Sequence, residues 1–359
     1  MFPYLAMLSL PTGLALISPA KRRFLLWSVA LLYFLMIGFR FRVGMDWNNY
    51  ISIYESKRLF GLLDFVFSRE PGYGVLMWIS MHVGGGMMLV DAISALVFCW
   101  GFFAVAKRCG EPWIAVAIAT PLLVVAFAMS AVRQAIAAGI IFYLIAHWER
   151  YRTSMRMLLV LLASLFHFSS VFIMLFVSLG SNASTIVKYA GALVIAALTI
   201  VLIAWAPDAA EAYSRLYVGS RQKIGAPGAI FQVAPLAAAG LIYLINRKAW
   251  IAVGADNPLY RNMAWASLIA VPTILVSSVG AYRFALYFWP MAMKVYGDIA
   301  LFIQGPTGRL FYRLCIVTAS FALLIGWLIL GNNSFAWLPY KNWLFEPHHA
   351  VLLRRPGGI

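Results

Sequence analysis

Charged residues are scarce in this chain. Only 11% of its 359 residues are charged and 63% are hydrophobic, whereas ordinary soluble domains carry roughly 25% charged residues. No hydrophilic block long enough to form a soluble domain interrupts the apolar sequence. These deficits exclude a soluble globular protein and predict a single integral membrane domain over residues 1–359.

The chain also lacks the signatures of several enzyme classes. It has no Walker loop, no serine elbow and no pair of acidic residues suited to a metal-bound nucleotide sugar. We therefore expect neither a metal nor a cofactor. Its basic stretches are too short to follow a phosphate backbone, so we expect no nucleic acid partner. Its three cysteines indicate no disulfide framework.

Long apolar stretches fill the sequence instead. A helix needs about 20 apolar residues to cross a bilayer, and the chain offers about ten or eleven such stretches. The sequence therefore predicts an all-α polytopic membrane protein with about 10–12 transmembrane helices and a few half-helices. Segment 72–83 is too short to span and is expected to be a half-helix on the outer face. Segment 157–185 is either one span or a broken hairpin, and the hairpin keeps the later topology consistent. Loops 40–70 and 206–228 are expected on the outer face, with interfacial helices.

The formal net charge of +16 has two interpretations. Lysine and arginine clusters at the cytoplasmic ends of helices anchor a protein to anionic lipid, and an anionic substrate also calls for positive charge. Arg40, Arg133 and Arg283 lie at the opposite, outer ends of their apolar segments. Cations on that side indicate a site for an anion presented from the bilayer.

The strongest local pattern is RFRVGMDWNNY at residues 40–50. Arg40 and Arg42 offer planar forks of donors that match phosphate oxygens, and Gly44 permits a tight turn. Asp46 is suited to orienting an arginine or accepting a proton, and the aromatic Tyr50 is suited to stacking on a sugar. The alternative is a juxtamembrane anchor of the interfacial aromatic and basic type.

Three further positions are candidates for chemistry. Arg133 and Gln134 open a helix, where an arginine opposes the macrodipole and favours a compensating anion; the alternative is an arginine that snorkels to the headgroups. His167, at the apex of the proposed hairpin, is either a proton carrier or a histidine hydrogen-bonded within the bundle. Tyr282 and Arg283 repeat the combination of aromatic and arginine at an outer helix start.

Other charges have plainer interpretations. Lys294 and Asp298 are four residues apart within an apolar helix and are expected to pair. Arg215, in loop 206–228, either reaches the cavity or is solvated.

Short motifs spread over the chain resemble the EpsG/Wzy-type family of bacterial polysaccharide polymerases. They are RFRVGMDWNNY at 40–50, EPGY at 70–73, SAVRQAIA at 130–137, LFHFSS at 165–170, AYRFALYF at 281–288 and LPY at 338–340. The resemblance implies a bundle similar to C-type glycosyltransferases. It also implies an inner-membrane enzyme that joins repeat units carried on undecaprenyl pyrophosphate, on the periplasmic side and without a metal. The functional residues implied by position are Arg40, Gly44, Asp46, Tyr50, Arg133, Gln134, His167, Arg283 and Tyr340, and the further substrate contacts expected are Arg42, Glu70, Arg215 and Tyr282.

Within this hypothesis, Arg40 and Arg283 bind the leaving pyrophosphate and Arg133 binds the phosphates of the second lipid. His167 or Asp46 is the candidate base. The partners expected are the lipid-linked oligosaccharide, membrane lipid and a chain-length regulator protein. A lipid-linked oligosaccharide flippase and a glycan ligase are the alternatives.

Overall fold

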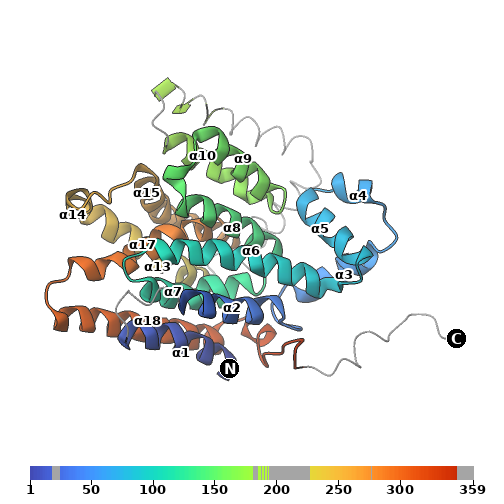
Figure 1. Ribbon diagram of the computed structural model, residues 1–359, viewed down its shortest axis with the longest axis horizontal. Helices are drawn as coiled ribbons and strands as arrows, with labels where there is room; N and C mark the ends of the chain where they lie inside the picture. Colours follow the sequence, from blue (N-terminus) through green and yellow to red (C-terminus); the bar gives the residue numbers. More distant parts are fainter. Residues whose placement is uncertain are drawn as a thin grey trace.

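The computed structural model describes residues 1–17, 25–180, 227–275 and 277–345, and a few positions between 185 and 193. Every regular element in these ranges is a helix (Figure 1). The longer α-helices are α1 (Phe2–Ile17), α2 (Leu25–Gly38), α3 (Trp47–Ser56), α5 (Pro71–His82), α6 (Gly86–Arg108), α8 (Val132–Ala146), α9 (Thr153–Ser164), α13 (Pro227–Ile245), α15 (Pro258–Thr273), α17 (Trp289–Phe302) and α18 (Pro306–Leu330). The shorter ones are α4 (Leu62–Val66), α7 (Pro112–Ala119), α10 (Ile173–Leu179), α14 (Arg247–Ala252) and α16 (Ser278–Ala285).

Three helices are by themselves long and apolar enough to cross a membrane, namely α6, α13 from Gly228 onward, and α18. Several shorter helices, among them α1, α2, α8 and α9, are also apolar but have only 10–17 residues. The predicted class, an all-helical membrane protein with short helices among long ones, is confirmed. The number of ten to twelve spans stays a prediction.

The bundle has two distinct ends, which α6 and α8 connect. These two helices run parallel, because Phe98 lies against Phe142 with ring centroids 6.3 Å apart and Trp100 lies against Tyr143 at 6.2 Å. At Gly101 a Cβ would overlap the backbone of α8, so only glycine allows this approach. The N-terminal ends of α6 and α8 lie at the same end of the bundle as α3, α4 and α5, at the right of Figure 1, and α14 lies at the opposite end. We call these the outer end and the basic end.

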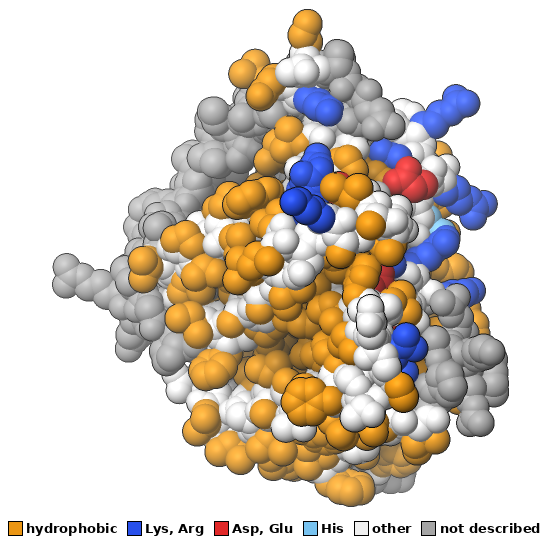
Figure 2. Space-filling view, turned by 90° about the vertical axis from the view of Figure 1, so that its left-hand side faces the viewer, with side chains coloured by type: hydrophobic (Ala, Val, Ile, Leu, Met, Phe, Trp, Pro, Cys, Tyr) orange, Lys and Arg blue, Asp and Glu red, His pale blue; other side chains and the backbone are white. Residues whose placement is uncertain are grey.

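Charged residues that are distant in sequence meet at the basic end. The side-chain amide of Asn257 donates to the Glu149 carboxylate over 3.0 Å, and Arg313 pairs with Glu111 at 2.5 Å. Figure 2 views the side of the molecule that carries α14 and shows lysine and arginine side chains in its upper part and along its right-hand side. By the lysine and arginine bias, this end is the one expected in the cytoplasm.

Lys294 and Asp298 form the ion pair that their spacing predicts. Lys294 also donates to the carbonyl of Arg108 over 3.1 Å, and Asp298 accepts from the Gly110 amide over 2.6 Å. Because Arg108 ends α6, the pair lies at the basic end and not in the middle of the bundle.

The segment after α8 turns back on itself. Helix α9 ends at Ser164, and after a short 3-10 turn α10 runs to Leu179. Near the start of α9, Arg156 donates to the carbonyl of Trp148 over 3.2 Å. Past the end of α10, a Cβ on Gly180 would lie 3.3 Å from the Trp148 side chain. Both ends of the segment therefore meet at Trp148, as the hairpin hypothesis predicted, and the break that contains His167 is the far end of the hairpin.

Two helix breaks lie within the apolar sequence, and the first was predicted. Helix α5 has 12 residues and is followed by Gly84 and Gly86, both at positive φ (70° and 59°), so the predicted half-helix is present. Pro121 lies in a π-helix that continues α7, Thr120–Ala128. There the indole of Trp337 donates to the Val125 carbonyl over 2.8 Å, which satisfies a backbone group from outside the helix.

Candidate functional site

Glu70 is the centre of a compact polar group at the outer end. One of its carboxylate oxygens accepts from Nη1 of Arg133 at 2.6 Å, and the other accepts from Nδ1 of His167, also at 2.6 Å. The Glu70 side chain is only 7% exposed, whereas Arg133 is 34% exposed. The carboxylate is thus held inside by two donors, while about a third of the arginine side chain is exposed.

Local sequence explains how Glu70 and His167 meet. Glu70 precedes Pro71, the first residue of α5, and a residue before proline is biased away from the helical conformation. The amide of Gly72 donates to the carbonyl of Leu165 over 2.8 Å, and a side chain at Gly72 would press against that residue. The start of α5 is therefore docked on the hairpin break two residues before His167.

The electrostatics fix the charge state of this group. Burial alone would raise the pKa of Glu70, but the hydrogen bond from His167 and the positive charge of Arg133 lower it below its ordinary value. Burial lowers the pKa of His167, and the nearby Arg133 and Arg283 lower it further, against the opposing effect of Glu70. At neutral pH the group therefore holds an ionised glutamate and a neutral histidine. The histidine donates through Nδ1, and its Nε2 is buried without a hydrogen-bond partner among the described residues.

Gln134 links this group to the helix that carries Arg283. Its amide nitrogen donates to the Arg283 carbonyl over 2.8 Å and to the Ser169 hydroxyl over 3.2 Å. Ser169 in turn lies 3.1 Å from the Tyr287 hydroxyl. The Arg283 side chain is half-buried and lies close enough to His167 to affect its charge. The motifs at 70–73, 130–137, 165–170 and 281–288 thus converge on one site.

Tyr50 joins this site from the preceding motif. Its buried ring lies 5.6 Å from the Arg133 guanidinium carbon, which is a cation–π contact. The ring also packs against Tyr73 at 6.0 Å, in the small apolar core that holds α3, α4 and α5 against α6 and α8.

Arg40 lies in a different environment. It is 2% exposed, pairs with Asp91 of α6 at 3.3 Å and donates to the Ile37 carbonyl at 2.6 Å. Its backbone forms an isolated bridge with Asn342. The guanidinium therefore lies inside the bundle, and its carboxylate partner is Asp91 and not Glu70.

The rest of the 40–50 motif forms a turn. Arg42 is exposed, has a φ of 54° and lies over the ring of Phe41 at 5.2 Å. Gly44 has a φ of 103°, and a Cβ there would collide with the backbone of Met129. The predicted need for glycine at this turn is confirmed. Asp46 precedes α3, is half-buried and does not cap the helix with its side chain.

Three predicted positions remain. Tyr340 donates to the Met36 carbonyl over 3.0 Å and accepts from Asn342, so it fastens the chain beside Arg40. Tyr282 is half-buried next to Arg283. Arg215 and most of loop 206–228 lie outside the described residues.

The sequence interpretation missed two residues, Asp91 and Ser169, which pair with predicted site residues. Asp91 is a carboxylate within the long apolar run of α6, and an acid at such a position is itself a signal, because charges within membrane helices are usually paired or functional. Ser169 gave no comparable signal, since a serine in an apolar segment is common. No group of three or more histidine, cysteine, aspartate or glutamate residues lies close enough to hold a metal ion in the part of the chain that the structure describes.

Together the fold and this site define an all-helical membrane protein with a buried carboxylate and histidine, paired with a partly exposed arginine, at one end of its bundle. The comparison with known families gives a more specific assignment. The chain belongs to the EpsG family, whose model matches residues 23–342, and this membership makes it a membrane protein of polysaccharide biosynthesis. No curated protein and no solved structure matches the chain.

Proposed function

We propose that this protein is a polysaccharide polymerase of the bacterial inner membrane. It would join oligosaccharide repeat units carried on undecaprenyl pyrophosphate, at a site on the periplasmic face. The observation that carries the proposal is the Glu70 carboxylate held between Arg133 and His167. This arrangement places a neutral base beside a partly exposed cation. In the transfer of a glycosyl group from a phosphate leaving group, the base accepts the proton of the acceptor hydroxyl and the cation stabilises the leaving phosphate.

The arginines would stabilise the leaving group. When the bond between the anomeric carbon and the pyrophosphate breaks, negative charge develops on the carrier phosphate. Guanidinium groups already in place stabilise that charge more in the transition state than in the ground state. Arg133, one-third exposed, and the neighbouring Arg283 are the cations that we assign to the phosphates of the two lipids. For Arg40, buried against Asp91, we propose a positioning role for the 40–50 turn.

His167 is the base that the geometry favours over Asp46. In the proposed step the acceptor hydroxyl oxygen attacks the donor anomeric carbon, and its proton passes to Nε2 of His167. The glycosyl–oxygen bond to pyrophosphate breaks, and the carrier leaves with the electron pair. Glu70 accepts the Nδ1 hydrogen, so it holds the tautomer in which Nε2 has a lone pair and stabilises the imidazolium that forms. Among the residues that the structure describes, Asp46 has no side-chain hydrogen bond that holds it in place.

Reconstitution tests the function directly. The purified protein, in vesicles with a defined undecaprenyl-pyrophosphate-linked repeat unit, should produce a ladder of longer products. Each elongation step should also release one molecule of undecaprenyl pyrophosphate. A His167→Ala variant of normal folding should lose the ladder, while His82→Ala, which changes an exposed histidine at the end of α5, should keep it. Movement of the lipid-linked unit across the bilayer without elongation would indicate a flippase. Transfer only to a different acceptor would indicate a ligase, and either result overturns the proposal.

A further inference from the structure

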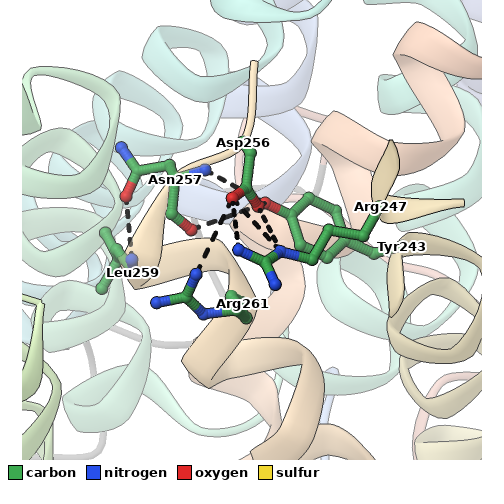
Figure 3. A network of polar contacts seen from close by, with 6 residues as sticks. All are labelled: Tyr243, Arg247, Asp256, Asn257, Leu259 and Arg261. Atoms are coloured by element: carbon green, nitrogen blue, oxygen red, sulfur yellow. Dashed lines mark hydrogen bonds and ion pairs between the residues drawn. The ribbon is translucent and has the colours of Figure 1, made fainter. Parts of the chain in front are cut away.

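A second cationic site lies at the basic end, where α13 ends and α15 begins (Figure 3). Asp256 accepts from Nη2 of Arg247 at 3.1 Å and lies 3.7 Å from Nη1 of Arg261. The Tyr243 hydroxyl donates to the same carboxylate over 2.7 Å. The Asn257 side chain caps α15 by accepting from the Leu259 amide at 2.8 Å. This network fixes both guanidinium groups at one corner of the bundle.

The corner carries more positive than negative charge. Burial opposes ionisation of Asp256, but the hydrogen bonds from Arg247 and Tyr243 and the charges of the two arginines lower its pKa. Its single negative charge is therefore present, and it is shared by two guanidinium groups. The Arg247 side chain is 43% exposed and that of Arg261 is 33% exposed, against 14% for Asp256. Arg247 lies closer to the carboxylate than Arg261 does, so the charge of Arg261 is the less neutralised of the two.

An apolar groove of about 440 Å³ opens beside these arginines. It runs along the outward faces of α13 and α15. Ile245 and Trp265 in its wall are 71% and 55% exposed. Its lining is Leu241, Leu244, Ile245, Trp265 and Leu268, with Arg247 and Arg261 at its polar edge.

The combination fits an amphiphile with an anionic head. Helix α13 is long and apolar enough to span a membrane from Gly228 to Ile245, so its end at Ile245 lies near the level of the headgroups. The groove extends from that level along the apolar part of the helix, and both cations lie at its headgroup edge. Basic pockets between membrane helices on the cytoplasmic side are suited to acidic lipid headgroups. A soluble anion would use the arginines but leave the apolar wall uncovered.

We propose that this groove binds an anionic phospholipid of the cytoplasmic leaflet, with its phosphate against Arg261 and Arg247 and an acyl chain along Trp265. The proposal concerns a site separate from Glu70 and does not depend on the polymerase reaction.

Quenching of Trp265 tests the proposal in the full-length protein. The protein is placed in phosphatidylcholine vesicles that contain a small, fixed fraction of either phosphatidylglycerol or phosphatidylcholine with brominated acyl chains. The contribution of Trp265 is the fluorescence that Trp265→Phe removes. We expect brominated phosphatidylglycerol to quench this contribution as if enriched about fivefold over brominated phosphatidylcholine, a ratio equivalent to about 1 kcal/mol for a basic residue at an anionic surface.

Matched variants separate a site from general attraction. Arg261→Gln should abolish the preference for phosphatidylglycerol, whereas Arg309→Gln, which removes an exposed cation at the start of α18, should retain it. Arg261→Lys keeps the charge and should keep most of the preference. Equal quenching by the two lipids would overturn the proposal. So would equal loss in the Arg261 and Arg309 glutamine variants, or a Trp265 shielded from both lipids by a second copy or another protein.

Discussion

Replacement of Glu70 by glutamine is the sharpest test of the proposed site. The wild-type carboxylate accepts from two donors at once, Arg133 and His167, each at 2.6 Å. A glutamine of the same shape has one acceptor oxygen and one NH₂ group. Arg133 is always charged and takes the oxygen, so the NH₂ faces Nδ1 of His167. The histidine then carries its proton on Nε2 and no longer offers a lone pair to the acceptor hydroxyl.

The expected loss is large for activity and small for folding. Loss of a positioned general base or of its correct tautomer lowers a rate by about 10²–10⁴-fold. Arg133 is one-third exposed, so water replaces part of its lost interaction, and we expect a stability cost of about 1–3 kcal/mol. The assay is the rate of product-ladder formation in vesicles, with thermal unfolding measured in parallel.

Glu55→Gln is the matched control, because Glu55 pairs with Arg58 on the exposed surface of α3 and should leave both quantities unchanged. Imidazole ¹⁵N chemical shifts of labelled protein report the tautomer independently of activity. A Glu70→Gln protein that elongates within a few-fold of the wild-type rate, or a histidine protonated on Nδ1 in that variant, would refute the reasoning.

Four further predictions concern Arg133, Arg40, Gly44 and the dependence of stability on pH. Arg133→Lys should elongate at least about tenfold more slowly at unchanged protein level, because an ammonium cannot contact Glu70 and a phosphate through one rigid fork; a rate equal to wild type would contradict this. Arg40→Ala should leave Asp91 buried and unpaired at a cost of about 3–5 kcal/mol, seen as loss of monodisperse protein in gel filtration, and Arg40→Ala/Asp91→Ala should recover part of it. Gly44→Ala should lower the melting temperature, because its φ of 103° and the adjacent backbone exclude a Cβ; an unchanged melting temperature would count against the turn. Since the pKa of Glu70 is lowered in the folded protein, its stabilisation is full above the ordinary value of 4.5 and is lost as pH falls below it. The melting temperature of wild type should therefore fall more steeply below pH 4.5 than that of Glu70→Gln.

Several structural predictions succeeded because they depend on local chemistry. The glycines after α5 end a half-helix because two of them adopt positive φ, and Gly44 occupies a turn that a side chain would block. Lys294 and Asp298 pair because residues four apart share a helix face. The place of that pair in the bundle could not be predicted, since a sequence window does not show that Asp298 of α17 lies beside Gly110.

By itself, the sequence determined the class of the molecule and the motifs that matter. The chain has little charge and long apolar stretches, and in a bilayer helices satisfy the hydrogen-bonding groups of the backbone of such stretches. Its outer arginines, histidine and glutamate stand out because such residues are rare in an apolar chain. Only the tertiary structure decided which of them act together. Arg40 and Arg133 are equivalent as sequence signals, yet one is buried against Asp91 and the other reaches the surface beside Glu70. The physical reason is that the packing of helices decides which side chains lie beside a carboxylate. The partners of Glu70 are 63 and 97 residues away in the sequence, so local residue spacing cannot predict these contacts.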